Sequence, residues 1–272
     1  MPRSNDFMLK KSKLLSSASI ITGLGLLSLT LGLATADPAE AEKSGEKPLK
    51  VLIVTGGCCH DYEFQSAAMI EGIGKRTGAE FTLVNEGGKG TDAQIALYDS
   101  PDWAKPYDVV IHNECFADTK DATYIRKITD AHKAGAPAVV VHCAMHTYRD
   151  VPIDDWRQFL GVTSRQHEHQ SEYPVKVEVA DHPVMKNFPE AWVTPKDELY
   201  IVTKTWDKTT VLATSKSEKN QAVQPVMWVN DFHGTRVVGT TYGHTNETFS
   251  DPVFLEFLSR GVVWAAGREW KD

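Results

Sequence analysis

The sequence lacks an excess of positive charge. Its 272 residues contain 29 lysines and arginines against 36 aspartates and glutamates, which gives a formal net charge of −7. Nucleic acids and anionic membrane surfaces attract positively charged proteins, so this charge balance argues against both as partners.

Cysteine is scarce, and its spacing excludes two common structural roles. The four cysteines form no CxxC zinc pattern and no framework typical of a small disulfide-rich domain. Cys58 and Cys59 are adjacent, so a bridge between these two residues is not expected. One long-range disulfide and free thiols that line a pocket remain as alternatives.

The apolar run near the N-terminus, Ser19–Leu33, is shorter than the ~20 residues that a membrane span needs. It follows a basic lead and precedes Ala34-Thr35-Ala36, a small-x-small cleavage pattern. The sequence therefore predicts a signal peptide over residues 1–36 and an exported, periplasmic or extracellular protein. A retained membrane anchor is the alternative. Removing this segment, with its four basic residues and Asp6, changes the net charge from −7 to −10.

Residues 37–48 are charged, contain proline and have no periodicity, so we expect a disordered leader there. Beyond it, strand-like and helix-like runs alternate and predict an α/β fold with an open, mostly parallel sheet and helices on both faces. The expected strands are Val51–Thr55, Glu80–Val84, Asp108–His112 and Ala138–His142, and the expected helices are Tyr62–Thr77, a short helix from Thr91, and Asp121–Ala134.

The second half has more β-branched and alternating runs. They predict extra antiparallel strands that extend the same sheet, so that residues 49–270 form a single domain. The expected elements are a short helix, Asp154–Leu160, the strands Val175–Val179, Leu199–Val202, Val211–Thr214, Pro225–Val229 and Val237–Thr241, and an amphipathic final helix, Pro252–Ala266.

Four strand-like runs end in histidine or cysteine within a few residues: Lys50–His60, Asp108–Cys115, Ala138–His146 and Arg236–Glu247. In an open parallel sheet the carboxyl ends of the strands line the crevice where ligands bind. The pattern therefore predicts one polar pocket, with His60, Glu114, His142 and His146 as candidate ligand-binding residues. Cys58, Cys59 and Cys115 are expected to line it.

The first of these turns, Thr55–His60, runs from a strand into a helix and contains Gly56 and Gly57. It matches neither GxGxxG nor GxxxxGK[ST], which argues against a nucleotide site. Two glycines and a helix start suit close approach to an oxygen-rich ligand. A tight turn with His60 as the helix cap is the alternative.

Cys143 comes just after a buried strand, where α/β hydrolases carry their nucleophile. A thiolate there is one hypothesis, if a histidine lowers its pKa, and a packed free cysteine is the other. His142 and His146 are four residues apart, a spacing that suits a metal ion or a sugar hydroxyl.

His244 has a carboxylate, Glu247, three residues on, which would orient an imidazole as a general base. A capping cluster for the helix at Asp251 is the alternative. In the run Asp197–Tyr200, alternation places Glu198 and Tyr200 on the same side. His167 and His169 would likewise share a side, as a metal pair or as exposed loop residues.

These motifs together resemble the ThuA-like (trehalose utilisation) family, whose fold is related to the class I glutamine amidotransferases. The resemblance spans nearly all of the chain after residue 48. Its landmarks are VLIVTGG…H, VVVH at His142, LGVTSRQHEH, His182-Pro183, DELY, PVMWV and, most specifically, Gly234–Gly267. Amidotransferases carry Gly-x-Cys-x-Gly where this chain has His142-Cys143-Ala144, which shifts the emphasis from Cys143 to His142 and His244.

The resemblance implies a carbohydrate substrate, a sugar or keto-sugar derivative. We expect acid–base chemistry, hydrolytic or eliminative, with His244 and Glu247 as the catalytic pair, Glu198 as a second carboxylate, and His142, His60 and Tyr200 holding hydroxyls. Three alternatives stay open: a thiol hydrolase that uses Cys143 and His244, a metal-assisted enzyme, and a carbohydrate-binding protein without catalysis. The sequence specifies no cofactor, although imidazole ligands for a divalent metal are present.

Overall fold

The computed structural model describes residues 46–271, which belong to one compact unit. The predicted signal peptide and nearly all of the predicted leader lie outside these residues, and residues 46–48 have no regular secondary structure. None of the helices in the described part of the chain has the length and hydropathy needed to cross a membrane.

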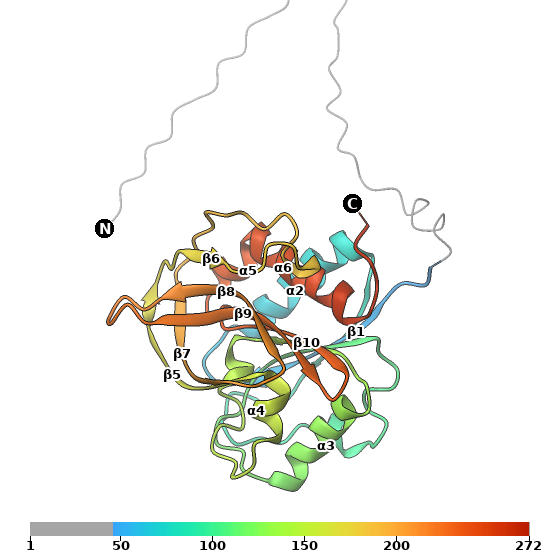
Figure 1. Ribbon diagram of the computed structural model, residues 1–272. Coiled ribbons are helices and arrows are strands. Elements are labelled where there is room, and N and C mark those ends of the chain that lie inside the picture. Colours follow the sequence, from blue (N-terminus) through green and yellow to red (C-terminus); the bar gives the residue numbers. More distant parts are fainter. Residues whose placement is uncertain (1–45, 272) are drawn as a thin grey trace, which may run out of the picture. The chain divides into compact units, whose positions relative to one another are not determined.

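An eight-stranded sheet forms the centre of the fold, in the order β2-β1-β3-β4-β10-β9-β8-β6 (Figure 1). The first five strands in that order run parallel, and the remaining three pairings are antiparallel. The strands are β1 (Lys50–Gly57), β2 (Glu80–Asn85), β3 (Val109–Cys115), β4 (Ala138–Val141), β6 (Val175–Val177), β8 (Thr209–Lys216), β9 (Val223–Phe232) and β10 (Thr235–Thr240). This arrangement confirms the predicted fold class.

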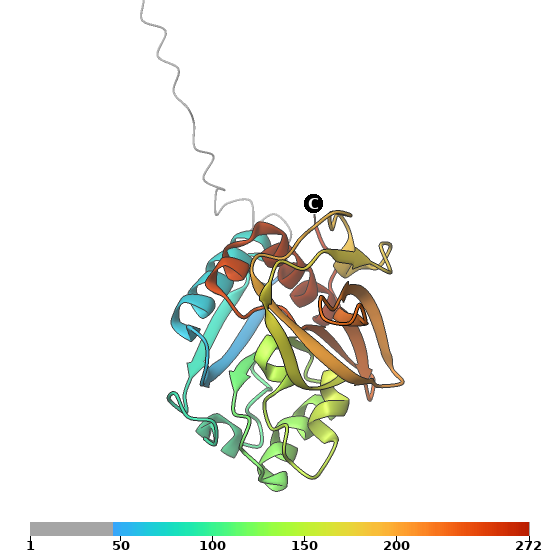
Figure 2. The same ribbon diagram turned by 90° about the vertical axis from the view of Figure 1, so that its left-hand side faces the viewer.

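Helices cover both faces of the sheet, as Figures 1 and 2 show. The apolar residues of β1, β3 and β4 alternate between two cores, so the strands are buried on both sides, as parallel strands require. One core includes residues of α2 (Tyr62–Thr77), α5 (Asn246–Ser250) and α6 (Pro252–Ala265). The other includes residues of α3 (Ala122–Lys133) and α4 (Asp155–Leu160).

The three longest helices in the described residues, α2, α3 and α6, each begin after an aspartate. The side chains of Asp61, Asp121 and Asp251 accept hydrogen bonds from backbone N–H groups of the first turn. Asp61, and not His60, is therefore the cap of α2. The described residues also contain short 3₁₀ turns: η2 (Ala96–Asp99), η3 (His142–Met145) and η4 (Pro183–Met185).

Three expectations about secondary structure are wrong. No helix begins at Thr91, where the chain bends before η2. The run His167–His169 lies in a ten-residue strand, β5 (Val162–Ser171), which was not predicted. β5 pairs with β7 (Asp197–Thr205) in a separate two-stranded sheet, so β7 does not extend the main sheet.

Candidate functional site

The carboxyl ends of β1, β3, β4 and β10 lie next to one another. Because these four strands are parallel neighbours, the turns that follow them meet at one edge of the sheet. The order β2-β1-β3 places a topological switch between β1 and β3, which is where ligands bind in open α/β sheets. The sequence-based expectation that the four histidine and cysteine turns come together is therefore confirmed.

A cavity of about 290 Å³ lies at this edge. This volume is close to the lower limit of small-molecule pockets. It is lined by residues from the four turns and from the β5–β7 sheet: Cys58, Cys59, His60, Thr91, Cys115, Ala117, Asp118, Cys143, His146, Arg149, His167, Glu198, Tyr200 and His244.

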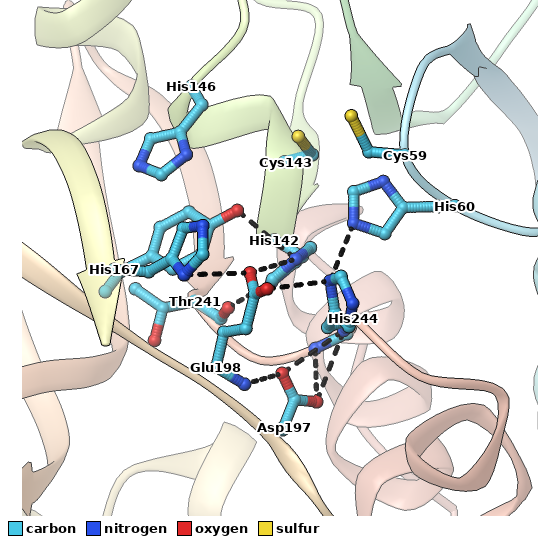
Figure 3. Close-up of polar contacts among 12 residues, drawn as sticks. Cys59, His60, His142, Cys143, His146, His167, Asp197, Glu198, Thr241 and His244 are labelled. Carbon is cyan, nitrogen blue, oxygen red and sulfur yellow. Dashed lines mark hydrogen bonds and ion pairs between the residues drawn. The ribbon is translucent and has the colours of Figure 1, made fainter. Parts of the chain in front are cut away.

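The carboxylate of Glu198 is at the centre of the polar contacts, on β7 (Figure 3). Its Oε1 is 3.3 Å from Nδ1 of His244. Its Oε2 is 3.6 Å from Nε2 of His142 and 3.5 Å from Nδ1 of His167. Nε2 of His60 is 3.1 Å from Nδ1 of His244. Three imidazoles from different segments thus contact a single carboxylate, and a fourth, that of His60, contacts His244.

His142 occupies the sharp turn after β4. Its φ of 46° lies in the left-handed region that side chains other than glycine rarely adopt. The backbone strain is offset by a 2.6 Å hydrogen bond from Nδ1–H to the carbonyl oxygen of Thr241, and Tyr200 donates its hydroxyl to Nε2 at 3.2 Å. His142, and not Cys143, therefore holds the strained position of this elbow.

His244 is positioned by the buried carboxylate of Asp197. Asp197 accepts hydrogen bonds from the backbone N–H groups of Gly243 and His244 and from the hydroxyl of Thr248. Alternation along β7 explains the arrangement, since Glu198 faces the pocket while its neighbour Asp197 faces the turn after β10. The imidazole of His244 is also 2.7 Å from the side-chain amide of Gln170 on β5.

The imidazoles of the pocket are held in their neutral form. The pKa of His60 is lowered to about 3, mainly by burial and to a smaller extent by the neighbouring His244. The pKa of His146 is also lowered to about 3, mainly by burial and to a smaller extent by His167. The same desolvation shifts the pKa of His142 well below its ordinary value and lowers that of His244. At neutral pH each of these rings is uncharged, and one of its two nitrogens carries a lone pair.

Burial raises the pKa of Glu198, and the neighbouring His167 opposes this rise. A carboxyl group that binds a proton more readily than usual can act as a proton donor or acceptor near neutral pH. The pocket therefore combines this carboxyl group with imidazoles from several elements.

His146 and Tyr200 form a flat wall of the pocket. Their rings stack at 4.0 Å between centroids and 5° between planes, and Nε2 of His146 is 3.1 Å from the hydroxyl of Ser164. The ring of His167 also lies near both, with its centroid 6.0 Å from that of His146 and 5.7 Å from that of Tyr200. Such a wall suits the apolar face of a small ring.

All four cysteines of the sequence form disulfides, Cys58–Cys59 and Cys115–Cys143. The expectation that adjacent Cys58 and Cys59 would not bridge is wrong. The disulfide of Cys143 also contradicts the thiol-hydrolase alternative, because the nucleophile must be a free thiolate. The sulfur atoms still line the pocket, as expected.

Two predicted site residues lie elsewhere. Glu114 is fully buried below the pocket, where its Oε1 pairs with Nδ1 of His112 at 2.9 Å, so it cannot contact a ligand. Glu247 is exposed at the start of α5, and the carboxylate that contacts His244 is that of Glu198. A spacing of three residues suggested the wrong partner because α5 directs Glu247 to solvent.

The structure also decides between the alternatives that two other sequence patterns left open. His167 and His169 do not form a metal pair, because His169 pairs with Glu218 at the surface while His167 faces the pocket. Gly56 and Gly57 have positive φ angles and allow close packing of the backbone, and they do not serve a ligand. A Cβ on Gly56 would be 2.0 Å from the carbonyl oxygen of Glu86, and a Cβ on Gly57 would be 2.2 Å from that of Cys115.

Arg149, which lines the pocket, and Gln170, which contacts the imidazole of His244, were not predicted from the sequence. Neither belongs to a motif, and their positions depend on β5 and on the turn after η3. Three groups in the described residues have the spacing of metal ligands. Two of them include disulfide-bonded cysteines, and the third is His60, His142 and His244.

The fold and the site define an α/β protein with a histidine-rich pocket around one carboxylate, at the switch point of its sheet. The family model described as trehalose utilisation, ThuA, matches residues 50–265. The chain therefore belongs to the ThuA family, as the sequence motifs indicated.

Solved structures with the same fold agree with this assignment. A putative ThuA-like protein from Parabacteroides merdae ATCC 43184 is 20% identical, with a TM-score of 0.68 over 83% of this chain and 93% of that chain. One from Bacteroides uniformis ATCC 8492 is 19% identical, with a TM-score of 0.62 over 81% and 92%.

A β-galactosidase from Bacillus circulans sp. alkalophilus is 12% identical, with a TM-score of 0.55 over 80% of this chain and 31% of that enzyme. At these identities the likeness concerns the fold alone. A search of the curated proteins gave no match.

Proposed function

We propose that this ThuA-family protein acts on a sugar or keto-sugar derivative by acid–base chemistry, hydrolytic or eliminative. The observation that carries the proposal is the contact between the Glu198 carboxylate and the imidazoles of His142, His167 and His244, at 3.3–3.6 Å. A carboxyl group with a raised pKa beside a neutral imidazole is a pair that can exchange a proton with a substrate.

The pocket also suits an uncharged, hydroxyl-rich ligand. Neutral imidazoles, the Tyr200 hydroxyl and the Gln170 amide can each donate or accept a hydrogen bond. The stacked rings of His146 and Tyr200 offer a flat surface for a sugar ring. The family assignment, trehalose utilisation, supports a carbohydrate as the substrate class.

The test is incubation with a panel of disaccharides and their 3-keto forms, followed by mass spectrometry of the products. We expect turnover of at least one compound, and loss of at least about 100-fold in rate on His244→Ala or Glu198→Gln, because a general acid or base contributes 10²–10⁴-fold. His169→Ala, which removes an exposed histidine outside the pocket, is the matched control.

Unchanged rates in both pocket variants would exclude the assigned roles. Binding of a sugar without any product would instead favour a carbohydrate-binding protein. We also propose that the protein is exported, on the basis of the N-terminal pattern of residues 1–36. The intact mass of protein from the periplasm or medium should then correspond to a chain that begins at Asp37, and a chain that begins at Met1 would contradict export by cleavage.

A further inference from the structure

The imidazoles of His60, His142 and His244 lie close together, and the carboxylate of Glu198 contacts two of them, His142 and His244 (Figure 3). Nε2 of His60 is 3.1 Å from Nδ1 of His244, and the ligand atoms of His60, His142 and His244 all lie within 4.8 Å of one another. The carboxylate oxygens are 3.3 Å from His244 and 3.6 Å from His142. Ligands about 2.0–2.1 Å from an ion at tetrahedral angles are about 3.3 Å apart. The spacings of His60 from His244 and of Glu198 from His244 and His142 are close to this value.

Hydrogen bonds behind two of the rings fix which nitrogen keeps a lone pair. Nδ1–H of His142 donates to the carbonyl oxygen of Thr241 at 2.6 Å, so the lone pair is on Nε2. Tyr62 donates its hydroxyl to the carbonyl oxygen of Cys58 at 3.0 Å, and its oxygen then accepts Nδ1–H of His60 at 3.1 Å. Metal-bound histidines usually make such contacts through the other ring nitrogen.

In the third ring, Nε2 of His244 accepts a hydrogen bond from the amide nitrogen of Gln170 at 2.7 Å, so the ring proton is on Nδ1, 3.1 Å from Nε2 of His60. An ion bound through Nδ1 would take the place of this proton, and rotation of the Gln170 amide would bring its oxygen to the N–H then formed at Nε2. The buried carboxylate of Glu198 adds a negative charge that a cation would neutralise.

From this arrangement we propose that His60, His142, His244 and Glu198 bind one divalent transition-metal ion, with zinc as the best match. Three imidazoles and a carboxylate suit Zn²⁺ and other first-row divalent ions, whereas Ca²⁺ and Mg²⁺ prefer shells made of oxygen. The nearby sulfurs are in disulfides and do not offer thiolates. Tyr200, which donates to Nε2 of His142, gives up that hydrogen bond when the ion binds.

Neutral imidazoles are the form that a metal ion requires. The ion would supply Lewis acidity to a carbonyl or hydroxyl oxygen in the pocket. The inference deepens the proposed function, since it concerns the same pocket, and it changes the role of His244 from proton acceptor to ligand.

The test is a titration of the chelator-stripped protein with Zn²⁺ by calorimetry, and with Co²⁺ by visible absorption. We expect one ion per chain and a Co²⁺ spectrum of tetrahedral or five-coordinate type. His142→Ala, His244→Ala and Glu198→Gln should each weaken binding by about 10- to 100-fold or more. His169→Ala, the matched control, should bind as the unaltered protein does.

Failure of the unaltered protein to bind Zn²⁺, Co²⁺, Mn²⁺, Fe²⁺ or Cu²⁺ at one site per chain would overturn the inference, whatever the stability of the variants. Binding that the pocket variants retain in full would overturn it as well. Sugar turnover that survives complete removal of metal would refute a catalytic role of the ion and leave the proposed function intact. A single bound ion without turnover of any sugar would support the site and count against the function.

Discussion

Asp197 is the residue on which the position of His244 depends. It is fully buried, and its carboxylate accepts hydrogen bonds from N–H of Gly243 at 2.9 Å, from N–H of His244 at 3.2 Å and from the hydroxyl of Thr248 at 2.6 Å. Burial raises its pKa to about 7, and the hydrogen bonds oppose the rise. One side chain on β7 thus fixes the turn after β10.

Asp197→Asn should destabilise the protein by about 3 kcal/mol, because the amide NH₂ would face backbone donors and leave them unpaired. Thr248→Val removes only one of the donors and should cost about 1–2 kcal/mol. Urea unfolding of both variants measures the difference. An Asp197→Asn variant as stable as Thr248→Val would show that the carboxylate does not organise this turn.

Among the elements, β9 and β10 pack closely against each other at Gly239 and Trp228. Gly239 of β10 lies opposite Trp228 of β9 in register. A Cβ on Gly239 would be 2.2 Å from Cε2 of the indole ring, and Nε1–H of that ring donates to the carbonyl oxygen of Leu160 at 2.7 Å. The ring is therefore held in place from both sides.

Gly239→Ala should destabilise the protein by about 1–3 kcal/mol or more, since the added methyl group overlaps a ring that cannot move aside. Gly74→Ala is the matched control. Gly74 lies inside α2, where a Cβ would be 3.5 Å from Phe81, an ordinary contact, and alanine should stabilise the helix by about 1 kcal/mol. Thermal unfolding of the two variants should show shifts of opposite sign; a Gly239→Ala protein that melts with the parent contradicts the packing argument.

At the scale of the whole molecule, the disulfide Cys115–Cys143 links the ends of two neighbouring parallel strands, β3 and β4, across 28 residues. The disulfide Cys58–Cys59 closes no loop, since its cysteines are adjacent. Closing a loop reduces the entropy of the unfolded chain, and the reduction grows with the length of the loop. The two disulfides should therefore contribute unequally to stability.

Replacing Cys115 and Cys143 together with serine should lower the free energy of unfolding by about 3–4 kcal/mol, as the length of the loop implies. The same replacement of Cys58 and Cys59 should change it by less than about 1 kcal/mol. Chemical denaturation of the two double variants under oxidising conditions compares them. Equal losses would mean that loop closure is not the source of the stability.

The sequence was sufficient for the architecture because its signals are local. Buried runs of Val and Ile, capping aspartates and the alternation of strands with helices indicate a parallel sheet, and the ThuA motifs indicate the same fold. The clustering of polar side chains could also be predicted, because the carboxyl ends of parallel strands lie at the same edge of the sheet. His60, His142 and His244 were found in this way.

The contacts that the side chains of the site make with one another depend on the tertiary structure and could not be predicted from the sequence. The carboxylate next to His244 is that of Glu198, on a strand of the second sheet, and not that of Glu247, three residues away in the chain. The pairing of Cys115 with Cys143 and the burial of Glu114 depend in the same way on segments far apart in the sequence. Local patterns determine which residues reach the sheet edge, whereas the contacts among them depend on how the β5–β7 pair packs over that edge.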